Sequence, residues 1–372
     1  MTAGDWRAAR SVLCVRLDAL GDVLMSTPAI RALKESLPGR RITLLTSSSG
    51  ARMAGMIPVI DDVIEYEAPW MKSAGSLAAR PEQTASELAM IEELRSRRFD
   101  AAVIFTVYSQ SPLPAALFCH LAGIPRRLAH CRENPYALLT DWVEEPEPES
   151  LIRHEVQRQL DLVASVGCRT CDDRLSISVS RAARERARAK LAACGVELRS
   201  PWVVMHPGAT APSRRYPPEH FAAAARLIAL EYGEQVVFSG STAERELVDG
   251  IRRAMIEPSF TLAGELDLHE LVALIAEAPL LVSNNTGPAH IAAATGTPVV
   301  DLYALTNPQH TPWRVAARVL SHDVPCKYCY KSVCPSGHHH CLRLVSPMSV
   351  VRAAGELLAA RPERAGAAME LS

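Results

Sequence analysis

A polar turn between two apolar segments carries the most chemically informative residues of this sequence. The stretch LLVSNNTGPAHIAAATGTPVV (280–300) predicts a strand, the turn SNNTG, a helix of small residues and a second strand. Gly287 and Pro288 would begin the helix, so its first backbone amides point towards the turn. A helix start of this kind binds anions, and His290 lies on its first turn, within reach of the same anion.

A second turn follows the predicted strand WVVMH (202–206), in the stretch HPGATAPSRRYPPEHF. Thr210 and Ser213 supply hydroxyl groups there, and Arg214 supplies a guanidinium group. Together with backbone amides, these groups can hold a phosphate. The alternative is an ordinary surface loop with solvated arginines.

Two more turns place a carboxylate at a helix start. Asp22 follows Gly21 in LDALGDVLMSTP, and Glu244 follows Ser241 in FSGSTAEREL. Glu244 can accept hydrogen bonds from both hydroxyls of a ribose, whereas each carboxylate can also simply stabilise its own helix start. Four such turns at the ends of predicted strands favour a nucleotide-diphosphate ligand.

The elements that must position these turns are alternating strands and helices. Predicted strands include 41–48, 62–66, 101–107 and 175–180 in the first half, while the acidic segment 143–150 is expected as a surface loop. The alternation continues after residue 200 and predicts an α/β fold of two Rossmann-like domains that face a central ligand cleft. The expected domains are 1–178 and 179–345, with 346–372 forming a helix that returns to the first domain and a tail.

Composition narrows the class of protein further. The 372 residues include 40 basic and 41 acidic side chains, for a formal net charge of -1, which argues against a nucleic-acid partner. No apolar run reaches the ~18–20 residues of a transmembrane segment. The polar start MTAGDWRAAR lacks a signal-peptide core, so a cytoplasmic location with reduced cysteines is expected.

Three motifs give the sequence a specific resemblance. LGDVLMSTPAIRALK, HPGATAPSRRYPPEHFAAAA and SNNTGPAHIAAATGTPVVDLYALTNP resemble the ADP-heptose:lipopolysaccharide heptosyltransferases of glycosyltransferase family 9. The resemblance extends from about Val12 to Ala360. It implies a GT-B fold, with the acceptor on the N-terminal domain and the donor nucleotide on the C-terminal domain. It also implies inverting, metal-independent transfer of heptose from ADP-heptose to the lipopolysaccharide inner core, in the cytoplasm and peripheral to the inner membrane.

The resemblance also assigns roles to residues. Asp22 corresponds to the family's proposed catalytic base, and Arg214 stands where most members have a lysine that contacts the donor phosphates. Glu244 corresponds to the ribose-binding glutamate. The diphosphate loop corresponds to Thr286, Gly287 and His290, and the expected donor site is completed by Thr210, Ser213 and Asn285.

Some positions depart from the family pattern. Asn285 replaces the usual aspartate of SNDTG, and its neutral amide suggests that Asn285→Asp would be tolerated. ALTNP (304–308) replaces the usual GPTDP, and Arg214 changes reach and geometry. Two alternatives therefore stay open: a GT-B enzyme for another nucleotide sugar or glycan, and a catalytically silent sugar-nucleotide-binding homologue. For the acceptor, Lys72 is a candidate for contacting core phosphates.

A cysteine-rich segment, CKYCYKSVCPSGHHHC, lies apart from these motifs. Cys326, Cys329, Cys334 and Cys341 have the spacing C-x2-C-x4-C-x6-C, which can hold a structural zinc in tetrahedral geometry. Free thiols and facultative disulfides are the alternatives. In either case no cofactor is expected to be required for catalysis.

Overall fold

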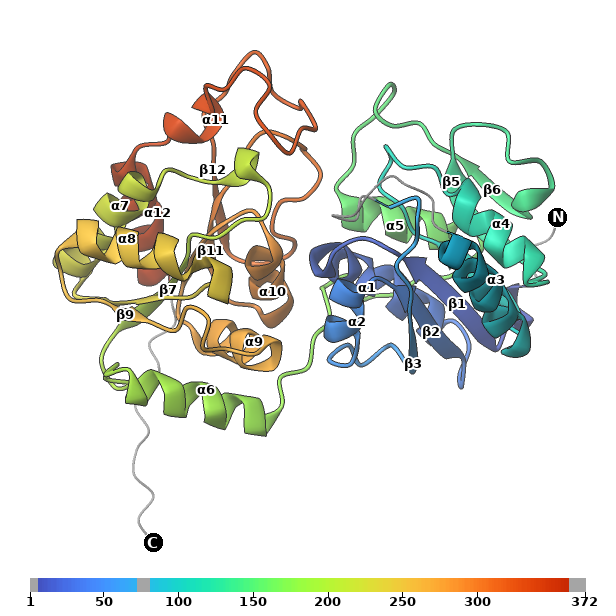
Figure 1. The fold of residues 1–372 in the computed structure, drawn as a ribbon, viewed down its shortest axis with the longest axis horizontal. Coiled ribbons are helices and arrows are strands. Elements are labelled where there is room, and N and C mark those ends of the chain that lie inside the picture. The colour runs from blue at the N-terminus through green and yellow to red at the C-terminus, as the bar shows by residue number, and fades with distance from the viewer. Residues whose placement is uncertain (1–5, 72–80, 361–372) are drawn as a thin grey trace, which may run out of the picture. The chain divides into compact units, whose positions relative to one another are not determined.

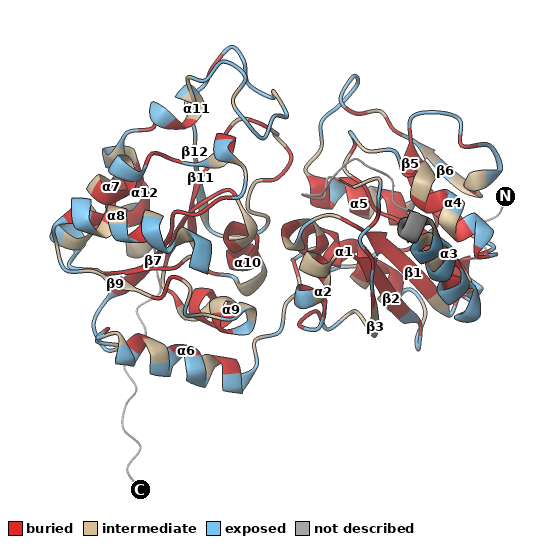
Figure 2. Cartoon of the chain, viewed as in Figure 1, coloured by how far each residue is buried: buried red, intermediate tan, exposed pale blue. Residues whose placement is uncertain are grey.

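Two separate parallel sheets organise the chain (Figure 1). The computed structural model describes residues 6–71 and 81–360. The chain divides into two units, Met1–Ser178 and Val179–Ser372, and each unit contains one six-stranded sheet. Figure 2 shows buried strands in each unit, covered by helices whose outer faces are exposed.

Unit 1 has the strand order β3-β2-β1-β4-β5-β6, which is the order of a doubly wound dinucleotide-binding fold. Its strands are β1 (Ser11–Arg16), β2 (Arg41–Thr46), β3 (Asp62–Glu65), β4 (Ala101–Ile104), β5 (Arg127–Cys131) and β6 (Asp141–Glu144). Its helices are η1 (Trp6–Ala8), α1 (Leu20–Glu35), α2 (Ser48–Ala54), α3 (Pro81–Ser96), α4 (Leu113–Leu121), η2 (Tyr136–Leu138) and α5 (Glu155–Ala164).

The first strand and helix of unit 1 follow directly from their sequence. β1 is buried along nearly its whole length, as expected for a central strand of a parallel sheet with helices on both faces. Only three residues separate Arg16 at its end from Leu20 at the start of α1. Asp22 therefore lies in the first turn of α1, at the carboxyl edge of the sheet. In a doubly wound sheet, ligands bind at this edge, where the strand order reverses between β1 and β4.

Two expectations for unit 1 were wrong. Residues 175–180 form no strand, and Ser176 N–H donates to Thr27 Oγ1 at 2.9 Å. The acidic segment is not simply a surface loop, because it begins in β6 and buries Glu145 and Glu147. Arg158 and Arg153 pair with these two carboxylates, and such pairing makes the burial of charge tolerable.

Unit 2 repeats the same topology with the order β12-β11-β10-β7-β8-β9. Its strands are β7 (Trp202–His206), β8 (Gln235–Phe238), β9 (Phe260–Thr261), β10 (Leu281–Asn284), β11 (Val299–Leu302) and β12 (Ala317–Leu320). Its helices are α6 (Arg181–Ala193), η3 (Pro212–Arg214), α7 (Pro218–Tyr232), η4 (Thr242–Glu244), α8 (Arg245–Met255), α9 (Leu268–Glu277), α10 (Gly287–Thr295), α11 (His340–Arg343) and α12 (Pro347–Ala359). The strand order reverses between β7 and β10, the strands that precede the two predicted phosphate turns.

The last helix, α12, belongs to unit 2, contrary to the expectation that it returns to the first domain. Its apolar residues, such as Val351 and Leu357, join a core that includes Ile228 of α7. Tyr232 of α7 donates to the backbone oxygen of Val351 at 3.3 Å. A Cβ at Gly355 would lie 2.2 Å from the Tyr232 hydroxyl oxygen, so glycine permits this close packing.

Within the described parts of the chain, no helix has the length and apolar character needed to cross a membrane.

Candidate functional site

The two phosphate turns of unit 2 are joined through a buried asparagine. Asn284, the last residue of β10, donates from Nδ2 to Pro207 O at 2.8 Å. Its Oδ1 accepts from the backbone N–H of Tyr216 at 3.0 Å. Asn284 therefore fixes the loop after β7 against the turn after β10. This role could not be predicted from the sequence, because an asparagine in a polar turn can make many different hydrogen bonds.

Asn285 is held by two acceptors beneath the turn. Its Nδ2 donates to Asp301 Oδ2 and to His310 O, both at 2.9 Å. All three residues are buried. The structure therefore argues against the tolerance of Asn285→Asp expected from the sequence, because an aspartate there would lose both hydrogen bonds that the amide group donates.

Asp301 is a site residue that the sequence reading missed. It is fully buried in β11, and this burial raises its pKa to about 8, against the opposing effects of the Asn285 hydrogen bond and the positive charge of Arg214. A single aspartate in an apolar strand was its only signal in the sequence, VVDLY.

The predicted anion-binding helix start is present after the turn. α10 begins at Gly287, with Thr286 at its N-cap and Pro288 in its first turn. Thr286 Oγ1 donates to Asn284 O at 3.3 Å, and this N-cap side chain makes no capping hydrogen bond to the first amides of the helix. His290 is buried on the first turn. Because the positive end of the helix dipole lies at the turn, this end can bind a diphosphate.

The side chains of the loop after β7 that were expected to bind phosphate fall into two groups. Thr210 is exposed and Arg214 is half-buried, and the positive charge of Arg214 acts to lower the pKa of Asp301. Ser213, by contrast, is buried and engaged, because its Oγ donates to Lys331 O at 2.8 Å. Thr210 and Arg214 thus remain available to a ligand, whereas the hydroxyl of Ser213 holds the loop in place.

Glu244 stabilises the start of the next helix. Its Oε2 accepts from Ser241 N–H at 2.7 Å and from Ser241 Oγ at 2.8 Å, so the simpler of its two predicted roles is present. Its carboxylate also approaches the β7 loop closely, because a Cβ at Gly208 would lie only 2.0 Å from Glu244 Oε1. Burial lowers the pKa of nearby His206, while the charge of Glu244 opposes this shift.

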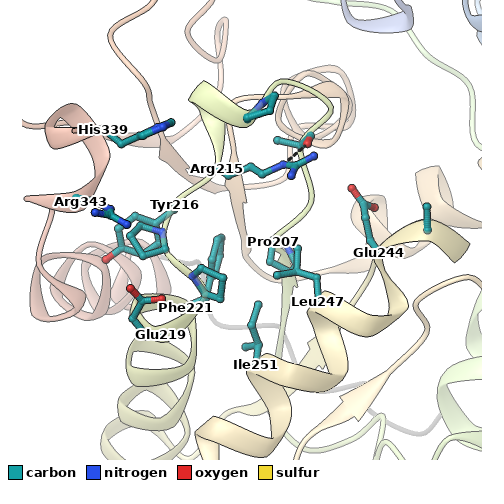
Figure 3. Close-up of a pocket in the computed structure, with 15 residues that line it drawn as sticks. Pro207, Arg215, Tyr216, Glu219, Phe221, Glu244, Leu247, Ile251, His339 and Arg343 are labelled. Atoms are coloured by element: carbon teal, nitrogen blue, oxygen red, sulfur yellow. Dashed lines mark hydrogen bonds between the residues drawn. The ribbon is translucent and has the colours of Figure 1, made fainter. Parts of the chain in front are cut away.

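A pocket of about 370 Å³ opens beside Glu244 (Figure 3). Pro207 and Leu247 lie between Glu244 on one side and His339 and Arg343 on the other. The remaining side chains include aromatic and aliphatic groups, so the pocket combines apolar walls with charged edges.

In unit 1, Asp22 belongs to a cluster around one buried arginine. Arg16 is fully buried, and its three guanidinium nitrogens each meet a carboxylate: Asp18 at 3.0 Å, Asp22 at 3.1 Å and Glu155 at 2.9 Å. Burial lowers the pKa of Arg16, but the three carboxylates raise it by more, so Arg16 stays charged. The side chain of Asp22 is 20% exposed, and Arg16 thus orients a carboxylate that a substrate can reach.

Asp18 is the second carboxylate at this edge, and the sequence reading assigned it no role. Gln110 donates to its Oδ1 at 2.6 Å. Burial raises the pKa of Asp18 to about 6, with Arg16 opposing the rise and Asp22 adding to it. Lys72, the predicted acceptor contact, lies outside the described residues.

The cysteine-rich segment lines a small cavity of about 20 Å³ in unit 2. Cys326, Cys329, Cys334 and Cys341 are free thiols around it, and Cys326 Sγ lies 3.5 Å from Nε2 of His338. Across residues 6–71 and 81–360, however, no three His, Cys, Asp or Glu side chains are arranged to hold a metal ion. The expected convergence of these thiols on one zinc is therefore not found.

The backbone of this segment accounts for its shape. Tyr328 N–H donates to Leu305 O at 2.6 Å, and Tyr330 N–H donates to Thr306 O at 2.8 Å. Ser213 N–H donates to Ser332 O at 3.0 Å. These hydrogen bonds attach the segment to two loops of unit 2, one of which carries Arg214.

Comparisons with known proteins agree with this architecture. Two six-stranded, Rossmann-like units match the GT-B fold of the solved heptosyltransferase structures. Residues 88–340 match the family described as glycosyltransferase family 9 (heptosyltransferase), and the chain belongs to this family.

Three similar proteins illustrate the match. Lipopolysaccharide heptosyltransferase 2 of Escherichia coli K12 is 27% identical over 358 residues, covering 93% of this chain and 98% of the relative. The structure described as E. coli ADP-heptose lps heptosyltransferase II has a TM-score of 0.72 at 25% identity, over 94% of this chain and 98% of that one. A glycosyltransferase family 9 structure from Veillonella parvula shares the fold, with a TM-score of 0.77 at 20% identity, over 94% and 97% of the two chains.

Proposed function

We propose that this enzyme transfers heptose from ADP-heptose to the inner core of lipopolysaccharide, with inversion at the anomeric carbon. Family membership and the named activities of the E. coli relatives support the proposal. Within the structure, the observation that carries it is the start of α10, where the N-cap side chain makes no capping hydrogen bond, at the point in unit 2 where the strand order reverses. Transfer to this acceptor would take place in the cytoplasm, at the membrane surface that presents the lipopolysaccharide core.

The donor binds unit 2 through its diphosphate and ribose. The backbone amides at Thr286 and Gly287, together with Arg214, contact the diphosphate. Glu244 accepts hydrogen bonds from the ribose hydroxyls, exchanging its present contacts with Ser241. A guanidinium and a helix start can balance the charge of the leaving ADP, so we propose that the reaction needs no metal ion.

The chemical step is a direct displacement. The acceptor hydroxyl oxygen forms a bond to the anomeric carbon of heptose, while the bond from that carbon to the ADP oxygen breaks and its electron pair leaves with ADP. Asp22 takes the proton from the acceptor hydroxyl as general base. Arg16 fixes the Asp22 carboxylate for this task, and Asp18 shares the same arginine. Lys72 remains the predicted contact for acceptor phosphates.

A donor screen with purified protein tests this function. Binding and turnover are measured with ADP-heptose, UDP-sugars and GDP-sugars, using lipopolysaccharide inner-core acceptors with and without a first heptose. We expect turnover with ADP-heptose alone. Turnover with a UDP- or GDP-sugar would identify another glycosyltransferase, and ADP-heptose binding without any turnover would identify a silent homologue.

A further inference from the structure

Asp301 lies below the diphosphate turn on the face of the sheet that α10 covers. β11 runs parallel to β10, with Asp301 opposite Ser283. Val300 and Leu302, on either side of it, belong to the core that contains α12. Because side chains alternate along a strand, Asp301 points to the opposite face, which carries α10.

One oxygen of the Asp301 carboxyl group has a hydrogen-bond partner and the other does not. Oδ2 accepts from Asn285 Nδ2 at 2.9 Å. Oδ1 is buried and has no hydrogen-bond partner among the residues that the structure describes. A buried carboxylate with one bare oxygen is costly, and a proton on that oxygen removes most of the cost.

The charged and titratable groups around Asp301 come from several elements. Arg214 contributes the positive charge from the β7 loop, and Tyr303 lies two residues further along the chain. His290 is the only titratable side chain on α10, and the backbone oxygen of His310 accepts the second hydrogen bond that Asn285 Nδ2 donates. Burial outweighs the effect of Arg214, so the pKa of Asp301 rises to about 8.

We propose that Asp301 is a positioning residue of the diphosphate site, which holds Asn285 in place and takes up a proton when the nucleotide diphosphate binds. This inference rests on the proposed function, because it requires the donor at the turn after β10. A bound diphosphate brings negative charge towards Asp301 and partly neutralises the positive charge of Arg214. Both effects favour the neutral carboxyl group, so binding and protonation reinforce each other.

The sign of the pH dependence follows from this linkage. Below pH 8, Asp301 in the free protein already holds its proton, and ADP binds without a further cost. Above pH 8, the proton must be taken from solvent, so the Kd for ADP should rise by up to about tenfold per pH unit. Asp301→Asn keeps an oxygen for Asn285 and cannot titrate, so its Kd should lack this contribution.

Calorimetric titration with ADP tests the proposal. Wild type and Asp301→Asn are compared from pH 7 to 9, in two buffers of different ionisation enthalpy, so that proton uptake is measured directly. Protons bound or released by ADP itself and by the buffer contribute equally to the measurements on both proteins. Near pH 8 we expect wild type to take up a fraction of a proton more than the variant for each ADP bound, because a site that is partly ionised before binding and mostly neutral afterwards must gain protons.

Asp301→Thr, which also lacks a titrating group, serves as a second variant and should behave like Asp301→Asn. Equal proton uptake and equal pH dependence in wild type and a folded variant would overturn the role of Asp301. Failure of wild type to bind ADP at pH 7 would instead overturn the proposed donor site, and this inference with it.

Discussion

Replacing Asn285 with aspartate should destabilise unit 2, because one buried amide group holds two acceptors. Asn285 Nδ2 donates to Asp301 Oδ2 and to His310 O. Asn285→Asp removes both hydrogen bonds and places a carboxylate against two oxygen atoms. Each buried acceptor left without its donor costs about 1–3 kcal/mol, so the expected loss is about 2–6 kcal/mol. At about 2–4 °C per kcal/mol, Tm should fall by about 4 °C or more.

The loss should depend on pH. Below pH 8, Asp301 carries a proton that it can donate to the new carboxylate, and this contact offsets part of the loss. Above pH 8, both groups tend to ionise, and their repulsion adds to it. The difference in Tm between wild type and Asn285→Asp, measured by differential scanning calorimetry, should therefore be larger at pH 9 than at pH 6.

A double-mutant cycle separates this pair from other effects. In Asn285→Asp/Asp301→Asn the amide and the carboxylate exchange positions, which restores one hydrogen bond between them but not the bond to His310. The double variant should be more stable than Asn285→Asp alone, with a coupling of about 1 kcal/mol or more. Strictly additive effects, or an Asn285→Asp variant as stable as wild type at pH 9, would refute the reasoning.

Four further predictions concern single positions or conditions. Glu244→Ala should weaken ADP binding by about 1.5–3 kcal/mol in calorimetry, as expected for the loss of charge-assisted hydrogen bonds, and Glu244→Gln should weaken it by less. Unchanged ADP affinity in both variants would show that Glu244 is not part of the site. Folding raises the pKa of Asp18 from 3.8 to about 6, so the folded protein loses stability as the pH rises through about 6. The Tm of Asp18→Asn should therefore increase relative to that of wild type between pH 5 and 7. A constant Tm difference over that range would contradict the burial effect. Arg214→Ala should reduce both ADP affinity and turnover, whereas Thr210→Ala should mainly reduce affinity; an Arg214→Ala variant with normal kinetics would exclude a phosphate contact. Activity should survive dialysis against EDTA, and its loss with recovery on adding a divalent metal ion would contradict a metal-independent reaction.

Much of the architecture could be predicted from the sequence because it depends on local patterns. Apolar runs such as WVVMH predict buried parallel strands, and the segments of small residues between such runs predict the crossover helices. Glycine and proline at 287 and 288 mark the start of α10, which the structure confirms. The short strands β5 and β12 were not recognised, because RLAHC and ARVL have no clear alternation of polar and apolar residues.

The contacts that fix the site were less predictable, since they join residues far apart in the chain. Asp301 and Asn285 are 16 residues apart, and neither has a pattern that names the other. Asp22 was recognised from its motif, but its orientation depends on Arg16, which reads as one more residue of a strand. Ser213 was expected to bind phosphate, whereas a loop more than 100 residues away engages its hydroxyl. Such pairings are set by packing, which local propensity does not describe.

The most direct test of the proposed reaction compares wild type with Asp22→Asn, using ADP-heptose and lipopolysaccharide inner-core acceptors with and without a first heptose. Turnover is followed by ADP release and by the mass of the extended core, and ADP affinity is measured in parallel. We predict transfer of one heptose by wild type, and a turnover lower by about 10²–10⁴ in Asp22→Asn with nearly unchanged ADP affinity, as expected for loss of a general base. No heptose transfer by wild type, or near-normal turnover by Asp22→Asn, would contradict the proposed mechanism.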